Sequence, residues 1–210
     1  VQQAGAVPVE TEGVDFLMAG GHKWLNAPVG TGFLCLSDRV LEKLEPASWG
    51  YLTLETPAGG WGNYFTTPSI TPDRRYDFVR TAQRFEIGGT ANYPGAIALA
   101  KSLELVNSVG IRRAGEHVWE LGERLIEGLR ALDVGLETRF GRENRAGIIS
   151  FSCGGRERDS ACVDFLLARK VYVGQRYTSG TGGVRASVHY FNDASDIDQL
   201  LAAVGDFLAR

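Results

Sequence analysis

The 210-residue sequence has few of the features that mark specialised classes of protein. Its three cysteines, Cys35, Cys153 and Cys162, are odd in number and widely spaced, which argues against a disulfide framework and against a zinc site. No apolar run is long enough to span a membrane, and residues 1–10 do not have the layout of a signal peptide. The formal net charge of −3 gives no reason to expect nucleic acid or an anionic membrane as a partner. We therefore expect a cytoplasmic protein.

The signatures of several well-known active sites are missing as well. The glycine-rich stretches GTG (30–32) and GTGG (180–183) lack the spacing of nucleotide-binding loops, and no G-x-S-x-G motif is present. The three histidines are far apart and have no acidic or cysteine partners at ligand spacing, so we expect no metal site. What remains is ordinary: 44% hydrophobic and 22% charged residues, at a length that can bury a core.

The first half of the chain predicts strands and loops. The apolar runs 14–20 and 29–36 predict two strands, the first of them buried, and the short connection favours antiparallel pairing. Ser37 is expected to cap a short helix over 38–45. Residues 45–83 hold many prolines, glycines and aromatics, with no convincing helix before Tyr76. Such a segment is either a functional lid or interface, or a packed surface loop.

The second half predicts a compact α+β unit. Helices are expected from Pro94 to Gly110, over 112–132 and over 159–170, with strands at 135–138, 146–153, 171–176 and 184–191. The glycine-rich segment 177–183 is expected to separate the last two strands as a loop. A final helix, capped by Ser195, carries one apolar stripe. We predict two domains, 1–108 and 109–210.

Three residues are candidates for chemistry, each with a plainer alternative. Lys23 lies in GGHK (20–23), where glycines permit close approach of the backbone; alternatively it is a turn lysine in solvent. Thr90 precedes a helix whose free N–H groups suit a phosphate, or it belongs to a capped loop. Arg185 begins an apolar strand and can hold a carboxylate, or it forms a salt bridge at a strand end.

Taken in order, four segments resemble the class V aminotransferase family of fold-type-I enzymes, which use pyridoxal 5′-phosphate (PLP). They are VQQAGAVPVE (1–10), DFLMAGGHKWLNAPVGTGFL (15–34), AQRFEIGGTANYPGAIALAKSLELV (82–106) and VRASVHYFNDASDIDQLLAAV (184–204). The family includes cysteine desulfurases, selenocysteine lyases, kynureninases and isopenicillin-N-epimerase-like proteins. The resemblance implies the C-terminal portion of the α/β PLP-transferase fold: a partial large, PLP-binding domain with a remnant of its sheet, and a smaller α+β domain.

The resemblance also implies roles for individual residues. Lys23 would form the Schiff base with the cofactor and move protons at the substrate's Cα. His22 would lie at the phosphate or the ring edge, and Gln2 would hydrogen-bond the ring's phenolic oxygen. Thr90 would reach the phosphate of a cofactor in the neighbouring subunit of a homodimer, and Arg185 would hold the substrate α-carboxylate. Two further residues would shape the pocket, Trp24 and Asn26.

The chain departs from the family pattern in four places. Gly20 stands where a phosphate-binding serine is common, and the segment before Thr90 carries one extra glycine. The loop QRYTSGTGGVR (175–185) lacks the nucleophilic cysteine that cysteine desulfurases carry there. Family members are also longer at the N-terminus, where they supply the aspartate that keeps the pyridine nitrogen protonated.

These observations leave several hypotheses open. The first is a PLP enzyme that acts on an amino acid or amine through Cα deprotonation, followed by transamination, epimerisation or elimination. A cysteine desulfurase or selenocysteine lyase-like enzyme is the alternative within the family. A catalytically silent fragment or interaction subunit is the alternative outside it, and a separate chain that supplies the missing half is a further possibility.

Overall fold

The computed structural model describes residues 12–71, 75–138, 141 and 145–210. Their contacts divide into two compact units, which we call the N-terminal unit (up to Ser102) and the C-terminal unit (Leu103–Arg210). The division falls inside helix α3 (Tyr93–Val109), which begins at the position expected from Pro94. The domain boundary predicted between residues 108 and 109 stays a prediction. Each unit is described by itself below.

The N-terminal unit contains a two-stranded sheet followed by a short helix. Strands β1 (Phe16–Gly20) and β2 (Gly32–Leu36) pair antiparallel, which confirms the expected pairing. Helix α1 (Asp38–Lys43) begins after Ser37, whose hydroxyl accepts a hydrogen bond from the backbone N–H of Val40 at 3.3 Å, as predicted. The expectation that the first strand is buried was wrong, since Met18 is 68% exposed.

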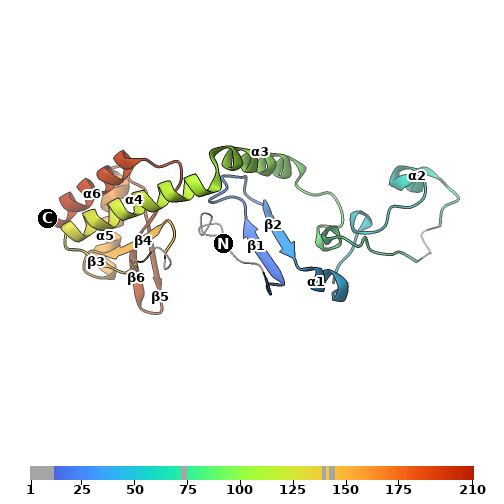
Figure 1. Cartoon of the computed structure of the whole chain (residues 1–210), viewed down its shortest axis with the longest axis horizontal. Coiled ribbons are helices and arrows are strands. Elements are labelled where there is room, and N and C mark those ends of the chain that lie inside the picture. The colour runs from blue at the N-terminus through green and yellow to red at the C-terminus, as the bar shows by residue number, and fades with distance from the viewer. Residues whose placement is uncertain (1–11, 72–74, 139–140, 142–144) are drawn as a thin grey trace. The chain divides into compact units, whose positions relative to one another are not determined.

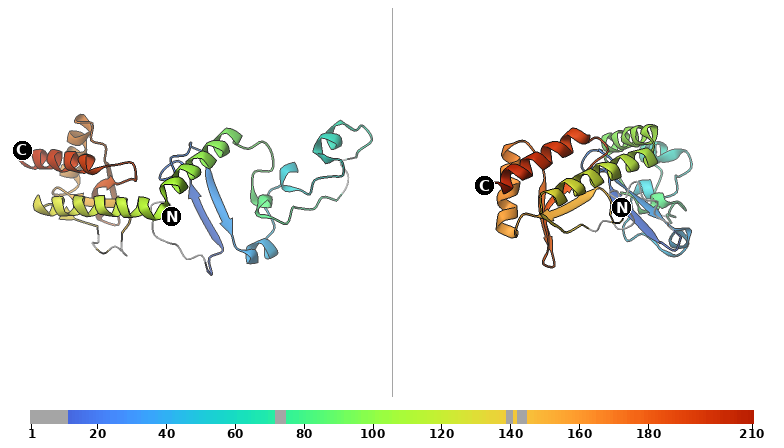
Figure 2. Two further views of the ribbon diagram at one scale, coloured as in Figure 1. Left: turned by 45° about the horizontal axis from the view of Figure 1, so that its top comes forward. Right: turned by 60° about the vertical axis from the view of Figure 1, so that its left-hand side comes forward.

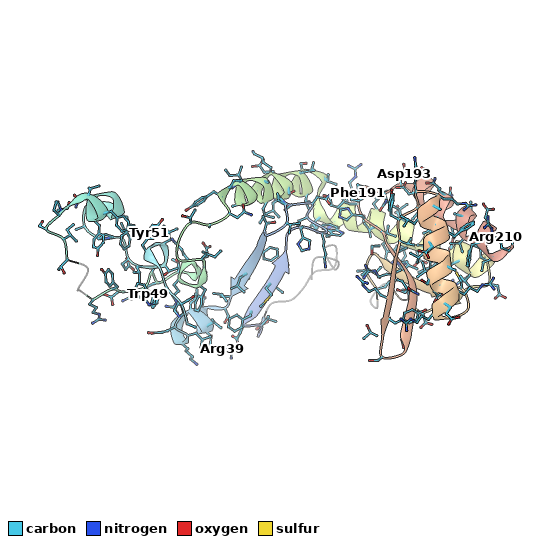
Figure 3. The ribbon with its side chains drawn as sticks, turned by 180° about the vertical axis from the view of Figure 1, so that it is seen from behind. Arg39, Trp49, Tyr51, Phe191, Asp193 and Arg210 are labelled. Atoms are coloured by element: carbon cyan, nitrogen blue, oxygen red, sulfur yellow. The ribbon has the colours of Figure 1, made fainter. Side chains whose placement is uncertain are left out.

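The segment after α1 is more ordered than the sequence predicts. It contains a helical turn η2 (Tyr51–Thr53), a helix α2 (Gly60–Thr66) and a helical turn η3 (Ala82–Phe85) (Figure 1). Helix α2 contradicts the expectation of no helix before Tyr76. Its aromatic side chains explain the difference: Trp61 and Phe65 lie 5.6 and 5.8 Å from Tyr51, ring centre to ring centre. These contacts offset the poor helix propensity of glycine, asparagine and threonine. Figure 3 labels Tyr51 and Trp49 in this segment.

The C-terminal unit packs three helices against a four-stranded antiparallel sheet. After α3 come α4 (Ile111–Ala131), β3 (Gly135–Leu136), β4 (Ile148–Ser152), α5 (Arg156–Ala168), β5 (Gly174–Thr178), β6 (Thr181–Ser187) and α6 (Ala194–Leu208). The strands lie in the order β3-β4-β6-β5. Figure 2 shows helices α4 and α6 side by side in this unit. The α/β character and the helix-strand order confirm the expected fold class.

The hydrophobic core of this unit lies between the sheet and its helices. Residues Ile149 and Phe151 of β4 and Val184 and Ala186 of β6 are buried there, whereas Ser150 and Arg185 belong to the other face of the sheet. Helices α4, α5 and α6 each contribute one buried stripe. The largest fully buried side chains of the core are Phe151, Leu125, Ile126, Leu129, Ile149 and Leu166.

Two details of the C-terminal unit correct the predictions. The segment 177–183 is not a loop: β5 and β6 run through it and leave a turn of two residues, Ser179 (φ 52°) and Gly180 (φ 79°). The cap of α6 is Asp193 rather than Ser195, because the Asp193 carboxylate accepts from the backbone N–H of Ser195 (2.8 Å) and of Asp196 (3.1 Å). A carboxylate at this end of a helix also interacts favourably with the helix dipole. Figure 3 labels Asp193.

Candidate functional site

Lys23 lies on a tight turn directly after β1. The turn is held by backbone hydrogen bonds from Gly21 N–H to Thr31 C=O (2.7 Å), from Asn26 N–H to Lys23 C=O (3.0 Å) and from Ala27 N–H to Gly21 C=O (3.0 Å). Trp24 anchors it, since only 6% of its surface is exposed. The side chains of His22 and Lys23 remain exposed. The turn therefore holds a fixed backbone and presents the lysine outward.

The two glycines before His22 and Lys23, Gly20 and Gly21, differ in what surrounds them. A Cβ atom on Gly21 would lie 2.5 Å from Thr31 Oγ1 and 3.3 Å from Leu99 Cδ1, so Gly21 lets helix α3 pack closely against the turn. A Cβ atom on Gly20 would lie 3.3 Å from the ring of His22. The imidazole thus folds back over the position where the family often has a serine. Of these two glycines, Gly21 is the one that packing requires.

The amine of Lys23 has no salt-bridge partner among the residues that the structure describes. A lysine that served only to balance a local charge would be paired with a carboxylate. Lys23 instead combines a fixed backbone, an imidazole neighbour and an amine that carries no ion pair. An amine and an imidazole on a fixed backbone fit a cofactor that carries both a carbonyl group and a phosphate.

Thr90 lies between η3 and α3 in the same unit, and its side chain is exposed. The preceding Gly88 packs against Gly50, backbone to backbone: a Cβ atom on Gly88 would lie 2.4 Å from the Gly50 nitrogen. Sequence reasoning missed Asn92, whose side-chain oxygen accepts from the Gly95 N–H at 3.0 Å at the start of α3. An asparagine immediately before a helix is a recognisable capping signal.

Thr31 links the start of α3 to the Lys23 turn. A Cβ atom on Gly95 would lie 2.8 Å from Thr31 Cγ2, and the Thr31 carbonyl accepts the hydrogen bond from Gly21. A groove of about 760 Å³ runs beside these contacts, lined largely by apolar residues of β1, β2, η3 and α3. The structure therefore brings the segments of Lys23 and Thr90 together in the N-terminal unit.

Arg185 lies on β6 in the C-terminal unit, directly opposite Ser150 on β4 and Gly174 on β5. Its guanidinium extends over Gly174, where an added Cβ atom would lie 3.5 Å from Nη2. The Nε atom is buried and has no hydrogen-bond partner among the described residues. A buried donor without an acceptor is costly, and a carboxylate would satisfy it.

Gln2 and the three cysteines are the remaining residues considered in the sequence analysis. Gln2 lies outside the described residues, so its role stays a prediction. Cys35 is exposed on β2, whereas Cys153 and Cys162 are buried in the core of the C-terminal unit. Hydrogen bonding to Cys153, together with burial, raises the pKa of the Cys162 thiol.

Neither a metal site nor a membrane-spanning helix is found in the part of the chain that the structure describes. No three histidine, cysteine or acidic side chains gather there as they would around a metal ion. None of the helices described has the length and apolar character needed to cross a bilayer.

Comparison with known proteins gives a consistent result. The family model for aminotransferase class-V matches residues 1–200. A probable cysteine desulfurase of Methanothermobacter thermautotrophicus is 32% identical over 208 residues, which cover 92% of this chain and 48% of the relative. A cysteine desulfurase of Salmonella newport is 30% identical over 208 residues, covering 95% of this chain and 47% of that protein.

Solved structures of cysteine-processing enzymes also match nearly the whole of this chain. The apo cysteine desulfurase of Thermococcus onnurineus NA1 matches with a TM-score of 0.78 and 25% identity, over 98% of this chain and 50% of that one. The cystine C–S lyase C-DES, in complex with its reaction product cysteine persulfide, matches with a TM-score of 0.76 and 26% identity, over 97% and 50%. The chain thus spans about half the length of the relatives that it matches.

Proposed function

The chain belongs to the class V aminotransferase family, and on that premise we propose that it contributes the lysine-bearing part of a PLP enzyme acting at the Cα of an amino acid. The family depends on PLP, which supplies, when bound, an electron sink for negative charge that develops at the substrate's Cα. The observation that carries the proposal is Lys23: an amine without a salt-bridge partner in the described ranges, on a turn fixed by three backbone hydrogen bonds.

Each candidate residue has a distinct task in this proposal. The Lys23 amine would hold the cofactor covalently and, once the substrate's amino group had displaced it, would be free to take up the proton from Cα. His22, whose ring lies over Gly20, donates to the phosphate in place of the serine hydroxyl that Gly20 lacks. The Thr90 hydroxyl donates to a phosphate of a neighbouring subunit in a homodimer. Arg185 receives the α-carboxylate of the substrate through its unsatisfied Nε and its Nη atoms.

Selective labelling tests the role of Lys23. The chain is incubated with a limiting amount of PLP, the product is fixed by borohydride reduction, and the modified lysine is identified by peptide mass spectrometry. We expect the pyridoxyl group on Lys23, and Lys23→Ala should remove it. Lys43, another lysine of the N-terminal unit, provides the matched control as Lys43→Ala. Label spread evenly over the lysines would contradict the proposal.

Arg185→Lys tests the carboxylate role. Because lysine cannot reproduce the planar fork of arginine, we expect weaker binding of amino acid substrates while Lys23 is still labelled by PLP. The measurement is the dissociation constant of an amino acid such as L-alanine for the variant and the unchanged chain. Equal affinities would refute this role for Arg185.

A second candidate function is cysteine desulfuration, favoured by the names of the relatives. A protein-bound persulfide requires an accessible cysteine, and the hairpin that precedes Arg185 turns through Ser179 and Gly180 without one. Cys35 is the exposed cysteine in the described residues. If the chain releases sulfur from L-cysteine, we expect no persulfide on the protein and no effect of Cys35→Ser, because Cys35 lies on β2 and not on the hairpin before Arg185. Persulfide-labelling mass spectrometry distinguishes this outcome from a desulfurase with a protein-bound persulfide.

A further inference from the structure

The hairpin of β5 and β6 extends past the end of β4. Strand β4 pairs with β6 from Ser187 to Val184, whereas β5 follows β6 outward from Arg185 to Thr181 (Figure 1). Residues 176–183, which we call the ribbon, therefore pair with each other and with no third described strand. A two-stranded ribbon is at best marginally stable alone, so its position depends on contacts with side chains.

The main such contact is the carboxylate of Asp159, which is completely buried. It accepts hydrogen bonds from the backbone N–H of Cys153 (2.6 Å), from the hydroxyl of Ser152 (3.0 and 3.2 Å) and from the hydroxyl of Tyr177 on the ribbon. One carboxylate thus joins the end of β4, helix α5 and the ribbon. A second bond, from the Gln175 amide to the Arg156 carbonyl (2.9 Å), ties β5 to the same turn of α5.

The carboxylate of Asp159 is buried without a counter-ion among the residues that the structure describes. Asp159 forms no ion pair with any residue in the described ranges, and burial of a charge without a counter-ion is costly. Its position in the first turn of α5 and its neutral donors offset that cost. An apolar residue at this place would leave the buried N–H of Cys153 without an acceptor and would not fix the orientation of Tyr177.

Gly183 provides an independent sign that the ribbon is held close to this point. A Cβ atom there would lie 2.2 Å from the Phe151 carbonyl oxygen and 3.3 Å from Asp159 Oδ2. The strand therefore passes against both groups, two residues before Arg185. The other end of the ribbon leads back to Gly174, over which the Arg185 guanidinium extends. Strand β5 is thus hydrogen-bonded to the first turn of α5, and β6 passes close to the same turn.

We propose that Asp159 is a positioning residue: through Tyr177 it clamps the ribbon to α5 and thereby sets where β6 presents Arg185. The importance of that placement rests on the proposed function, in which Arg185 receives a carboxylate. The clamp itself concerns only the described residues of the C-terminal unit. Its loss would leave the core intact but let the ribbon, and with it the supported guanidinium, move.

The test compares the 210-residue chain with Tyr177→Phe, which removes one hydroxyl, and with Asp159→Asn, which removes the charge. Asp164→Asn, an exposed aspartate on the same helix, is the matched control. Amide hydrogen exchange is measured over 174–187 and, as an internal reference, over α4. Loss of a hydrogen bond to a charged group changes the equilibrium constant for local opening by about tenfold. We therefore expect amide exchange about tenfold faster in the ribbon and unchanged exchange in α4.

Two further measurements separate a clamp from general destabilisation. Titration of acetate against ¹⁵N-labelled protein, followed at the Arg185 Nε–H signal, should show affinity lowered at least threefold in Tyr177→Phe and unchanged in Asp164→Asn. The double variant Asp159→Asn with Tyr177→Phe should lose little more than Asp159→Asn alone, because Tyr177→Phe removes a contact that Asp159→Asn already weakens.

Each outcome has a distinct meaning. Ribbon exchange unchanged in Tyr177→Phe and Asp159→Asn would overturn the clamp. Faster ribbon exchange with unchanged acetate affinity would overturn the positioning role and leave the proposed function standing. If Arg185→Gln leaves acetate binding unchanged, the carboxylate role of Arg185 fails instead, and the exchange rates alone decide the clamp.

Discussion

Substitution of Gly183 by alanine tests the close passage of β6 past the end of β4. The added Cβ atom would lie 2.2 Å from the carbonyl oxygen of Phe151 and 2.9 Å from its carbonyl carbon. Both are backbone atoms in the sheet, so they cannot rotate away as the end of a side chain can. The variant must therefore separate β4 from β6 or shift the ribbon away from Asp159.

The size of the effect follows from these contacts. Overpacking of a well-packed site costs about 1–3 kcal/mol, and we place Gly183→Ala at the upper end because backbone blocks the new atom. A loss of about 3 kcal/mol in the free energy of local opening corresponds to exchange on the order of a hundredfold faster. Hydrogen exchange of peptides covering 148–153 and 174–187 measures this quantity without requiring two-state unfolding of the whole chain.

Gly174 supplies the control, since it belongs to the same hairpin but has room for a Cβ atom. A Cβ atom there would lie 3.5 Å from Arg185 Nη2, an ordinary van der Waals distance. Alanine reduces the conformational freedom of the unfolded chain, which stabilises by about 0.4–1 kcal/mol where the backbone permits it. We expect exchange in Gly174→Ala to be unchanged or slower. If Gly183→Ala exchanged as slowly as Gly174→Ala, the reasoning from the close contact would be refuted.

Three further predictions concern charge and reactivity. Arg145, whose side chain is 1% exposed, is paired with Glu123, so Glu123→Gln should destabilise by about 3 kcal/mol in urea unfolding, whereas Asp198→Asn, at a surface pair, should change little. A thiol reagent should modify Cys35 in the folded chain and reach the two core cysteines only after unfolding, as counted by mass spectrometry; rapid reaction of all three would contradict their burial. The hydrogen bond to a buried carboxylate raises the pKa of Tyr177, so the stability from this contact is complete below the ordinary tyrosine pKa and is lost as the pH rises through the raised value. A phenolate absorbance titration should show one tyrosine ionising late in the wild type and absent in Tyr177→Phe; no late-ionising tyrosine would count against the contact.

Local sequence signals predicted much of the architecture. The apolar periodicity of α4 and α6, the serine cap of α1 and the antiparallel pairing of β1 with β2 could all be recognised within windows of about ten to twenty residues. These features depend on neighbours in the chain, so a sequence window contains the interactions that form them. The candidate site residues could be predicted for a different reason: four segments of the chain resemble one family in the same order.

Errors arose wherever distant segments decide the outcome. Helix α2 forms from residues of weak propensity because Tyr51 packs against its aromatic side chains. The glycine-rich 177–183 becomes paired strand because both halves of the hairpin find each other across a two-residue turn. Neither contact leaves a periodic signal in the sequence.

By itself, the sequence determined the α/β class, the position of Lys23 on a glycine-bordered turn after a strand, and the family to which the chain belongs. Only the tertiary structure decided that Asp159 is buried, that it joins α5 to the ribbon, and that the Nε of Arg185 is left without an acceptor in the described residues. The physical reason is that a buried polar group is defined by partners far along the chain. Its energy is fixed only when the packed elements bring those partners within hydrogen-bond distance.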